Sequence, residues 1–162
     1  MSRYALLFVL AIAIIALALF VAGQVGLLRG KAPADLGLTD GKLKRPSKTE
    51  NSVSSQAAQW PDHPRLAYAL IEPLTYSGSG AEAMKRLAAM LNAMPRTSIV
   101  SNQPDYIYAQ CSTQLLKFTD DIEFALDEAA SVIHVRSASR LGQKDFGVNR
   151  ARVEAIRASM EK

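Results

Sequence analysis

Hydrophobic residues are distributed unevenly along the 162-residue chain. Tyr4 to Gly23 contains no charged residue and consists mainly of Ala, Leu, Ile and Val. As a helix rising 1.5 Å per residue, residues 4–23 would be about 30 Å long, enough to cross the hydrocarbon core of a bilayer. A cleaved signal peptide is the alternative, but its apolar region is usually shorter, and Val21-Ala22-Gly23 is a poor cleavage site. We therefore expect residues 1–23 to form an uncleaved transmembrane anchor.

Small and polar residues dominate the next stretch. Gly, Pro, Ser, Lys and Asp occur there without a sustained apolar period, which is typical of a tether. We expect residues 24–64 to be a flexible linker, followed by a folded domain at residues 65–162. The turn from Trp60 to Pro64 is more typical of a packing anchor than of a ligand platform.

The expected domain alternates between strand and helix periods. A β-type run lies within residues 66–75. From Met84 to Met94, apolar residues recur at the spacing of one helix face, and Pro95 ends the pattern. A second amphipathic helix begins near Val148. Between the helices, alternation of polar and apolar positions predicts strands within residues 97–101, 105–114, 115–126 and 132–137.

The expected order of elements after the transmembrane helix is β-α-β-β-β-β-α. Neighbouring strands joined by short turns form an antiparallel sheet, and two helices can cover only one of its faces well. We therefore predict the α+β class, with both helices packed on one face of the sheet.

The net charge of +4 is concentrated near the N-terminus. Residues 1–65 hold eight basic and four acidic residues, whereas residues 66–162 hold eleven of each. The folded part therefore has no excess of basic residues for nucleic acid, and the cations are placed to lie close to a membrane. Cys111 is the only cysteine, so no intramolecular disulfide can form, and its alternation with core residues predicts a buried thiol. We expect no metal and no cofactor.

Charged residues of the last two expected strands form the first candidate cluster. Asp121 and Glu123 would face His134 and Arg136 if these strands pair as a hairpin, and opposite charges across such a ladder stabilise it. A metal or acid–base cluster that also contains Asp120 is the alternative, although Arg136 would repel a cation.

The second candidate cluster lies around Gly142 and Gly147, where the last strand passes into the last helix. Arginine donors and free N–H groups at a helix start suit an anionic head group. Alternatively, Asp145 caps the helix and the arginines pair with Asp120, Asp121 and Glu154. The candidate ligand-binding residues are His134, Arg136, Ser137, Ser139, Arg140, Asp145, Asn149 and Arg150, supported by Asp120, Asp121 and Glu123.

Several motifs resemble those of an uncharacterised family of bacterial and plastid proteins known only as a domain of unknown function. They are NSVSSQ at residues 51–56, FTDDIEF at 118–124 and VIHVRSASRLG at 132–142 followed by DFGVNR at 145–150. The resemblance spans roughly residues 36–159 and implies no activity. Many members carry a cysteine pair near the first motif, which implies an oxidising compartment. Pro46 and Ser52 occupy those places here.

A positive-inside count of the flanking residues slightly favours a cytoplasmic domain, whereas the family resemblance favours an extracytoplasmic one. We expect a single-pass protein of the inner membrane with its domain on the extracytoplasmic side. The expected function is a non-enzymatic envelope module that binds an anionic small molecule, a lipid head group or a protein partner. A hydrolase that uses His134 with a nearby Ser or Asp is one alternative, and a structural or assembly factor is another.

Overall fold

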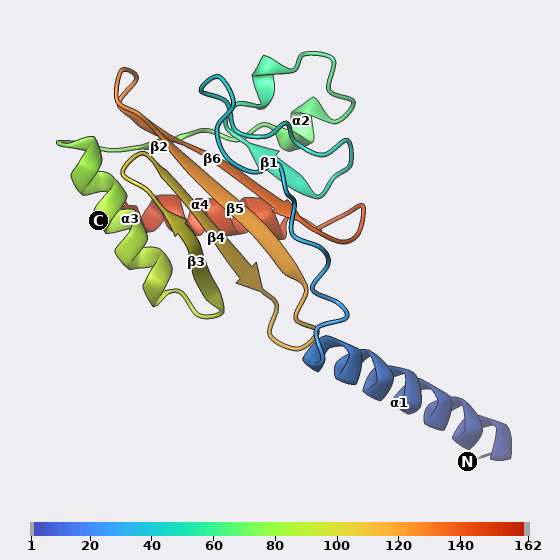
Figure 1. Cartoon of the computed structure of the whole chain (residues 1–162). Helices are drawn as coiled ribbons and strands as arrows, with labels where there is room; N and C mark the ends of the chain where they lie inside the picture. Colours follow the sequence, from blue (N-terminus) through green and yellow to red (C-terminus); the bar gives the residue numbers. More distant parts are fainter. Residues whose placement is uncertain (1, 161–162) are drawn as a thin grey trace.

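A long apolar helix projects from one end of a two-layer domain in the computed structural model, which describes residues 2–160 (Figure 1). This helix, α1 (Arg3–Gln24), begins after Ser2, whose hydroxyl accepts a hydrogen bond from the backbone N–H of Ala5. Gly23 is its only buried residue, at the end that meets the domain. Among the helices of residues 2–160, α1 alone is long and apolar enough to cross a bilayer.

The domain is built on a six-stranded antiparallel sheet, which confirms the predicted α+β class. β5 and β6 form its central hairpin, in which Phe124 pairs with Val135 and Glu123 pairs with Arg136. β2 (Leu74–Thr75) pairs with the start of β6. The other strands lie in the order β1 (Ser52–Ser54), β6 (Val132–Ser139), β5 (Thr119–Asp127), β4 (Tyr106–Ser112) and β3 (Thr97–Asn102).

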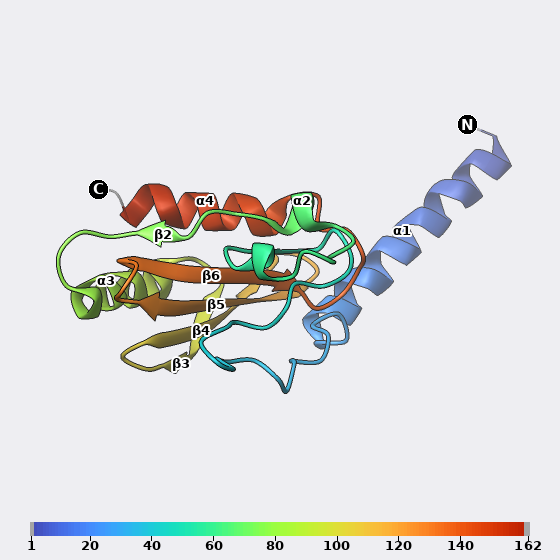
Figure 2. The same ribbon diagram turned by 90° about the horizontal axis from the view of Figure 1, so that it is seen from above.

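Two amphipathic helices, α3 (Gly80–Ala93) and α4 (Val148–Met160), complete the core with the apolar face of the sheet (Figure 2). Leu87 of α3 and Val153 of α4 are fully buried there, as is Phe124 of β5. Burying each large apolar side chain stabilises the fold by roughly 1.5–3 kcal/mol.

Two expected elements differ in the structure. A strand was expected within residues 66–75; the strand found there, β2, is only two residues long, and the start of the range forms the short helix α2 (Leu66–Ala69). A short apolar run fits either state, and the periodicity of four residues cannot distinguish them. The expected linker is partly packed onto the domain, because residues 52–54 form β1 and residues 57–59 form the 3-10 turn η1 (Ala57–Gln59). Leu43 and Val53 are both buried.

The remainder of the expected linker passes over the second face of the sheet, the face that carries the polar residues. Residues 31–48 run on the side opposite α4 (Figure 2). The backbone N–H of Gly37 donates to Oε1 of Glu123 at 2.9 Å, and the backbone N–H of Leu43 donates to the side chain of Gln56 at 2.8 Å. We call residues 31–48 the cover segment.

Candidate functional site

Charged residues are buried between the sheet and the cover segment. Glu123 is 0% exposed and Arg136 is 4% exposed. Arg136 Nη1 donates to Glu123 Oε2 at 3.0 Å, while Glu123 Oε1 accepts from the hydroxyl of Tyr106 at 2.8 Å and from Gly37. Burial, followed by the charge of Glu123, raises the pKa of Tyr106, so this hydroxyl stays protonated and donates. Glu123 therefore has partners at both oxygens.

A second buried ion pair lies beside the first. Arg140 donates through Nε and Nη2 to the two oxygens of Asp121, at 2.9 and 2.7 Å. Tyr108 donates to the same carboxylate at 2.6 Å. The hydrogen bond with Asp121 raises the pKa of Arg140, and burial followed by the bond to Asp121 raises the pKa of Tyr108. A paired, planar contact of this kind is the strong form of an arginine–carboxylate interaction.

On the helix-covered face, a hydrogen-bonded network joins β6 to the start of α4. Asn149 is fully buried and contacts Ser137 and Ser139 through its side chain, at 2.6 and 2.9 Å. Asp145 accepts from the backbone N–H groups of Gly147 and Asn149, so it caps α4. This is the helix-capping arrangement that the sequence left open as an alternative to an anion site.

The charge state of Asp145 follows from its partners. Burial opposes its ionisation, but hydrogen bonds from Tyr68, Gly147 and Asn149 outweigh that effect and lower the pKa of the carboxyl group. Asp120 lies on the same face and pairs with Arg152 at 2.5 Å. Among residues 2–160 no group of three or more His, Cys, Asp and Glu side chains could hold a metal ion.

The remaining candidate residues lie apart from these networks. His134 Nδ1 is 3.2 Å from the hydroxyl of Ser55, and its Nε2 is 3.6 Å from Asp127, which is too long for a hydrogen bond. Arg150 donates to the backbone carbonyls of Tyr68 and Leu70, at 2.7 and 2.8 Å. Arg140 and Arg150 therefore hold different parts of the fold, and the structure does not bring them together.

A cavity of about 390 Å³ lies between the cover segment and the polar face of the sheet, and we call it the cationic pocket. Asp121 is the one carboxylate in its lining. Lys31 and Lys48 form no ion pair within the described chain, whereas the other four cations are paired with carboxylates. The cations that line the pocket are Lys31, Lys44, Arg45, Lys48, Arg136 and Arg140.

Two of these arginines have an unused donor. Nε of Arg136 and Nε of Arg45 are the buried side-chain nitrogens without a hydrogen-bond partner in residues 2–160. Buried N–H groups are nearly always paired, so each such exception requires an explanation. From the sequence, the cations of the cover segment were placed in a flexible linker and were not candidate site residues. The excess of basic residues in residues 1–65 was the one sequence feature that pointed to them.

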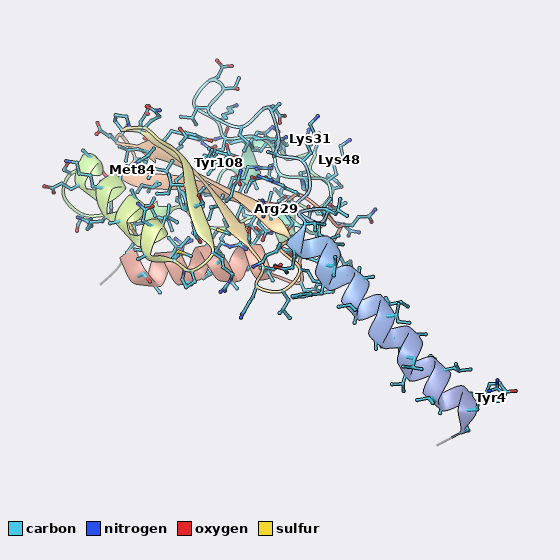
Figure 3. All side chains as sticks on the ribbon, turned by 60° about the horizontal axis from the view of Figure 1, so that its bottom comes forward. Tyr4, Arg29, Lys31, Lys48, Met84 and Tyr108 are labelled. Atoms are coloured by element: carbon cyan, nitrogen blue, oxygen red, sulfur yellow. The ribbon has the colours of Figure 1, made fainter. Side chains whose placement is uncertain are left out.

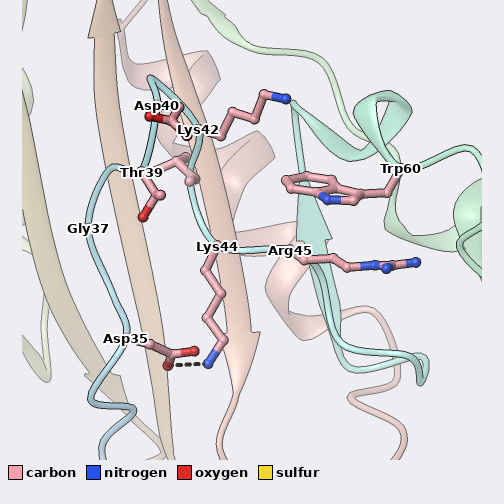
Figure 4. A pocket seen from close by; sticks show the side chains of 9 residues that line it. Asp35, Gly37, Thr39, Asp40, Lys42, Lys44, Arg45 and Trp60 are labelled. Carbon is pink, nitrogen blue, oxygen red and sulfur yellow. Dashed lines mark hydrogen bonds and ion pairs between the residues drawn. The ribbon is translucent and has the colours of Figure 1, made fainter.

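An open groove of about 450 Å³ adjoins the cationic pocket and shares Lys44 and Arg45 with it (Figure 4). Lys44 is held there by Asp35 at 2.5 Å, and this hydrogen bond lowers the pKa of Asp35. The ring of Trp60 lies beside Arg45. Arg45 also pairs with Asp62 at 2.9 Å. These exposed pairs set the positions of two cations at the pocket.

Comparison with known protein families agrees with the extent of the folded domain. A family model described as a protein of unknown function, DUF1499, matches residues 42–160. This range contains all six strands and begins inside the cover segment, before β1. Searches of curated proteins and of solved structures found no match. The family resemblance inferred from the motifs is confirmed, and the chain belongs to the DUF1499 family.

Proposed function

We propose that this protein is a membrane-anchored module that binds a phosphate-bearing anion in the cationic pocket. The observation that carries the proposal is that Lys31 and Lys48 form no ion pair within residues 2–160 although they line a pocket with six cations and one carboxylate. The proposal keeps the expected anionic ligand. It moves the site away from Asn149, Asp145 and Arg150, whose polar groups are hydrogen-bonded within the fold.

The energetics favour an anionic occupant. Lys31 and Lys48 supply two positive charges that are not neutralised by a carboxylate within residues 2–160. Phosphate suits this donor set, since lysine acts as a point charge and arginine as a directed donor.

The position of the pocket makes a lipid head group a natural source of this phosphate. Lys31 and Lys48 lie close to the end of α1 from which the chain leaves the membrane, as does Arg29 (Figure 3). Cations at this level are attracted to anionic lipids by about 1 kcal/mol per residue. Soluble phosphate esters share the same chemistry, so the binding experiment has to separate the two sources.

The proposal is tested with the full-length protein in nanodiscs. Native mass spectrometry and titration calorimetry would measure the binding of phosphatidylglycerol, with phosphatidylcholine and soluble glycerol phosphate as separate arms. We expect Lys31→Ser/Lys48→Ser to weaken anion binding at least tenfold. Lys85→Ser/Arg86→Ser, which removes the same charge from an exposed part of α3, should leave the affinity unchanged.

Equal affinity in both double variants would refute the proposal, as would binding that does not saturate. Retention of bound glycerol phosphate without a preference for phosphatidylglycerol would identify a soluble ligand. The extracytoplasmic location belongs to the same proposal. A reporter that is active only outside the cytoplasm, fused after Lys162, should be active, and an inactive reporter would reverse the orientation.

Hydrolysis by His134 has weaker support. Asp127 is beyond hydrogen-bond distance from the imidazole, and His134 does not line the cationic pocket. The hydroxyl of Ser55 also accepts the backbone N–H of Val135 at 2.9 Å, as a structural hydroxyl does.

A further inference from the structure

Two loops at the same end of the sheet expose apolar side chains. Residues 113–118 connect β4 to β5, and residues 140–147 connect β6 to α4. Because Asp120 pairs with Ser139, these loops leave the sheet side by side. The exposed apolar residues are Leu115 at 65%, Leu141 at 43% and Phe146 at 93% exposure in the loops, and Val148, the first residue of α4, at 47%. We call these four residues the apolar tip.

The end of α1 contacts the first loop, and Gly30, in the segment that follows α1, contacts the second. The side chain of Gln24 donates to the backbone carbonyl of Leu115 at 2.8 Å. A Cβ on Gly23 would come within 2.6 Å of the carbonyl oxygen of Leu116, so the two backbones touch there. In the same way, a Cβ on Gly30 would lie 3.1 Å from Cγ of Leu141. Leu115 therefore lies where α1 joins the domain, and Leu141 lies against the segment that follows α1.

The length of α1 places this point at the membrane surface. Its 22 residues extend about 33 Å at 1.5 Å per residue, against a hydrocarbon core of about 30 Å. If α1 spans the bilayer, Gly23 and Gln24 lie at the boundary between the acyl chains and the head groups. The loop at residues 113–118, which contacts these residues, lies at the same depth, and the loop at residues 140–147 leaves the same end of the sheet beside it.

The apolar tip has the composition that is typical of residues at the membrane interface. Leu141, Phe146 and Val148 border an apolar cavity of about 300 Å³ that opens between the loops. Two lysines flank the apolar side chains: Lys117 lies in the first loop, and Lys144, which forms an exposed ion pair with Glu50 at 3.4 Å, lies in the second. Phe146 has a φ of 54°, in the left-handed region that is rare for a bulky residue, and its ring is almost wholly exposed. An exposed aromatic residue with neighbouring lysines is the composition of an interfacial anchor.

We propose that the apolar tip inserts into the interfacial layer of the bilayer that α1 spans, so that the domain is held against the lipid surface. The inference rests on the membrane-spanning part of the proposed function and not on anion binding. It adds a second contact between protein and membrane and fixes which end of the sheet faces the lipid. The cationic pocket then lies beside the head groups.

Nitroxide accessibility in proteoliposomes tests this inference with the full-length chain. The label is placed at Phe146→Cys, and separately at Leu115→Cys in the other loop, both in a Cys111→Ala background. Oxygen partitions into lipid and a nickel chelate stays in water. We expect oxygen to relax both labels several times more strongly than the chelate does. The matched control is Ala129→Cys, exposed in the turn between β5 and β6, about 26 Å along the sheet from Thr119.

At Ala129→Cys the chelate should dominate. The inference is overturned if all three labels prefer the chelate. It is also overturned if the two tip labels are shielded from both reagents, since that result means that a protein surface, such as a second copy, covers the tip. Alkaline carbonate extraction of the unmodified chain reports separately on α1. If carbonate releases the protein, α1 does not span the membrane, and the membrane-anchoring proposal is refuted whatever the labels at the tip report.

Discussion

Removing one member of the buried Arg136–Glu123 pair should destabilise the domain far more than removing an exposed pair. In Arg136→Met the carboxylate of Glu123, which is 0% exposed, loses its cation. Breaking a buried ion pair in this way costs about 3–5 kcal/mol, because one charge remains buried and uncompensated. With an m-value of about 2 kcal/mol/M for urea, the unfolding midpoint should fall by about 2 M.

The structure also supplies the rescue and the control. Adding Glu123→Gln removes the orphaned charge, while the amide oxygen still accepts from Tyr106 and Gly37, so most of the lost stability should return. Lys44→Met breaks an exposed pair, in which the Asp35 side chain is 70% exposed, and should cost about 0–1 kcal/mol. Urea unfolding of the detergent-solubilised chain, followed by Trp60 fluorescence, measures all three. The reasoning is refuted if Arg136→Met costs no more than Lys44→Met, or if Glu123→Gln deepens the loss.

Two further predictions concern the helix cap and the anchor. Because its partners depress the pKa of Asp145 below the ordinary value of 3.8, its ionised form stabilises the fold above about pH 4, and this contribution is lost as the pH falls through the depressed pKa. Asp145→Asn should therefore lower the melting temperature at pH 7 and make it less dependent on pH below 4; a wild-type acid profile in the variant would contradict this. Gly23→Val should separate α1 from the loop at residues 113–118, since its Cβ would meet the carbonyl of Leu116 at 2.6 Å. Hydrogen exchange should then rise in that loop but not at α3, and an unchanged loop would show that the close contact is not required.

The long, regular elements could be predicted from sequence because each carries enough residues to display its period. α3 shows four helical turns, and the nine residues of β5 show the alternation that places Asp121 and Glu123 on one face. A short turn joins β5 to β6, so the two strands were expected to pair as a hairpin. That pairing, together with the alternation, predicted the contact of Glu123 with Arg136. These features depend on neighbours in the sequence.

The missing features depend on contacts between distant residues. The hydrogen bond from Gly37 to Glu123 joins positions 86 residues apart, and no local pattern in the cover segment predicts it. β1 is three residues long, too short to show a period. Arg140 and Arg150 were grouped because they are close in sequence. Between them the chain passes from the sheet into the helix layer, so proximity in sequence did not become proximity in space.

The position of the charges explains why the proposed anion would meet the cover segment and not the sheet. On the sheet, Arg136 and Arg140 are each paired with a buried carboxylate, which neutralises their charges within the fold. The same carboxylate of Glu123 also accepts the N–H of Gly37, which fastens the cover segment over the sheet. The charged face therefore serves first to hold a segment that would otherwise be a loose tether. Once it is held, Lys31 and Lys48 are fixed at the pocket, and their charges remain available to the anion that we propose. The excess of positive charge in residues 1–65 is thus concentrated where a phosphate from the bilayer could reach it.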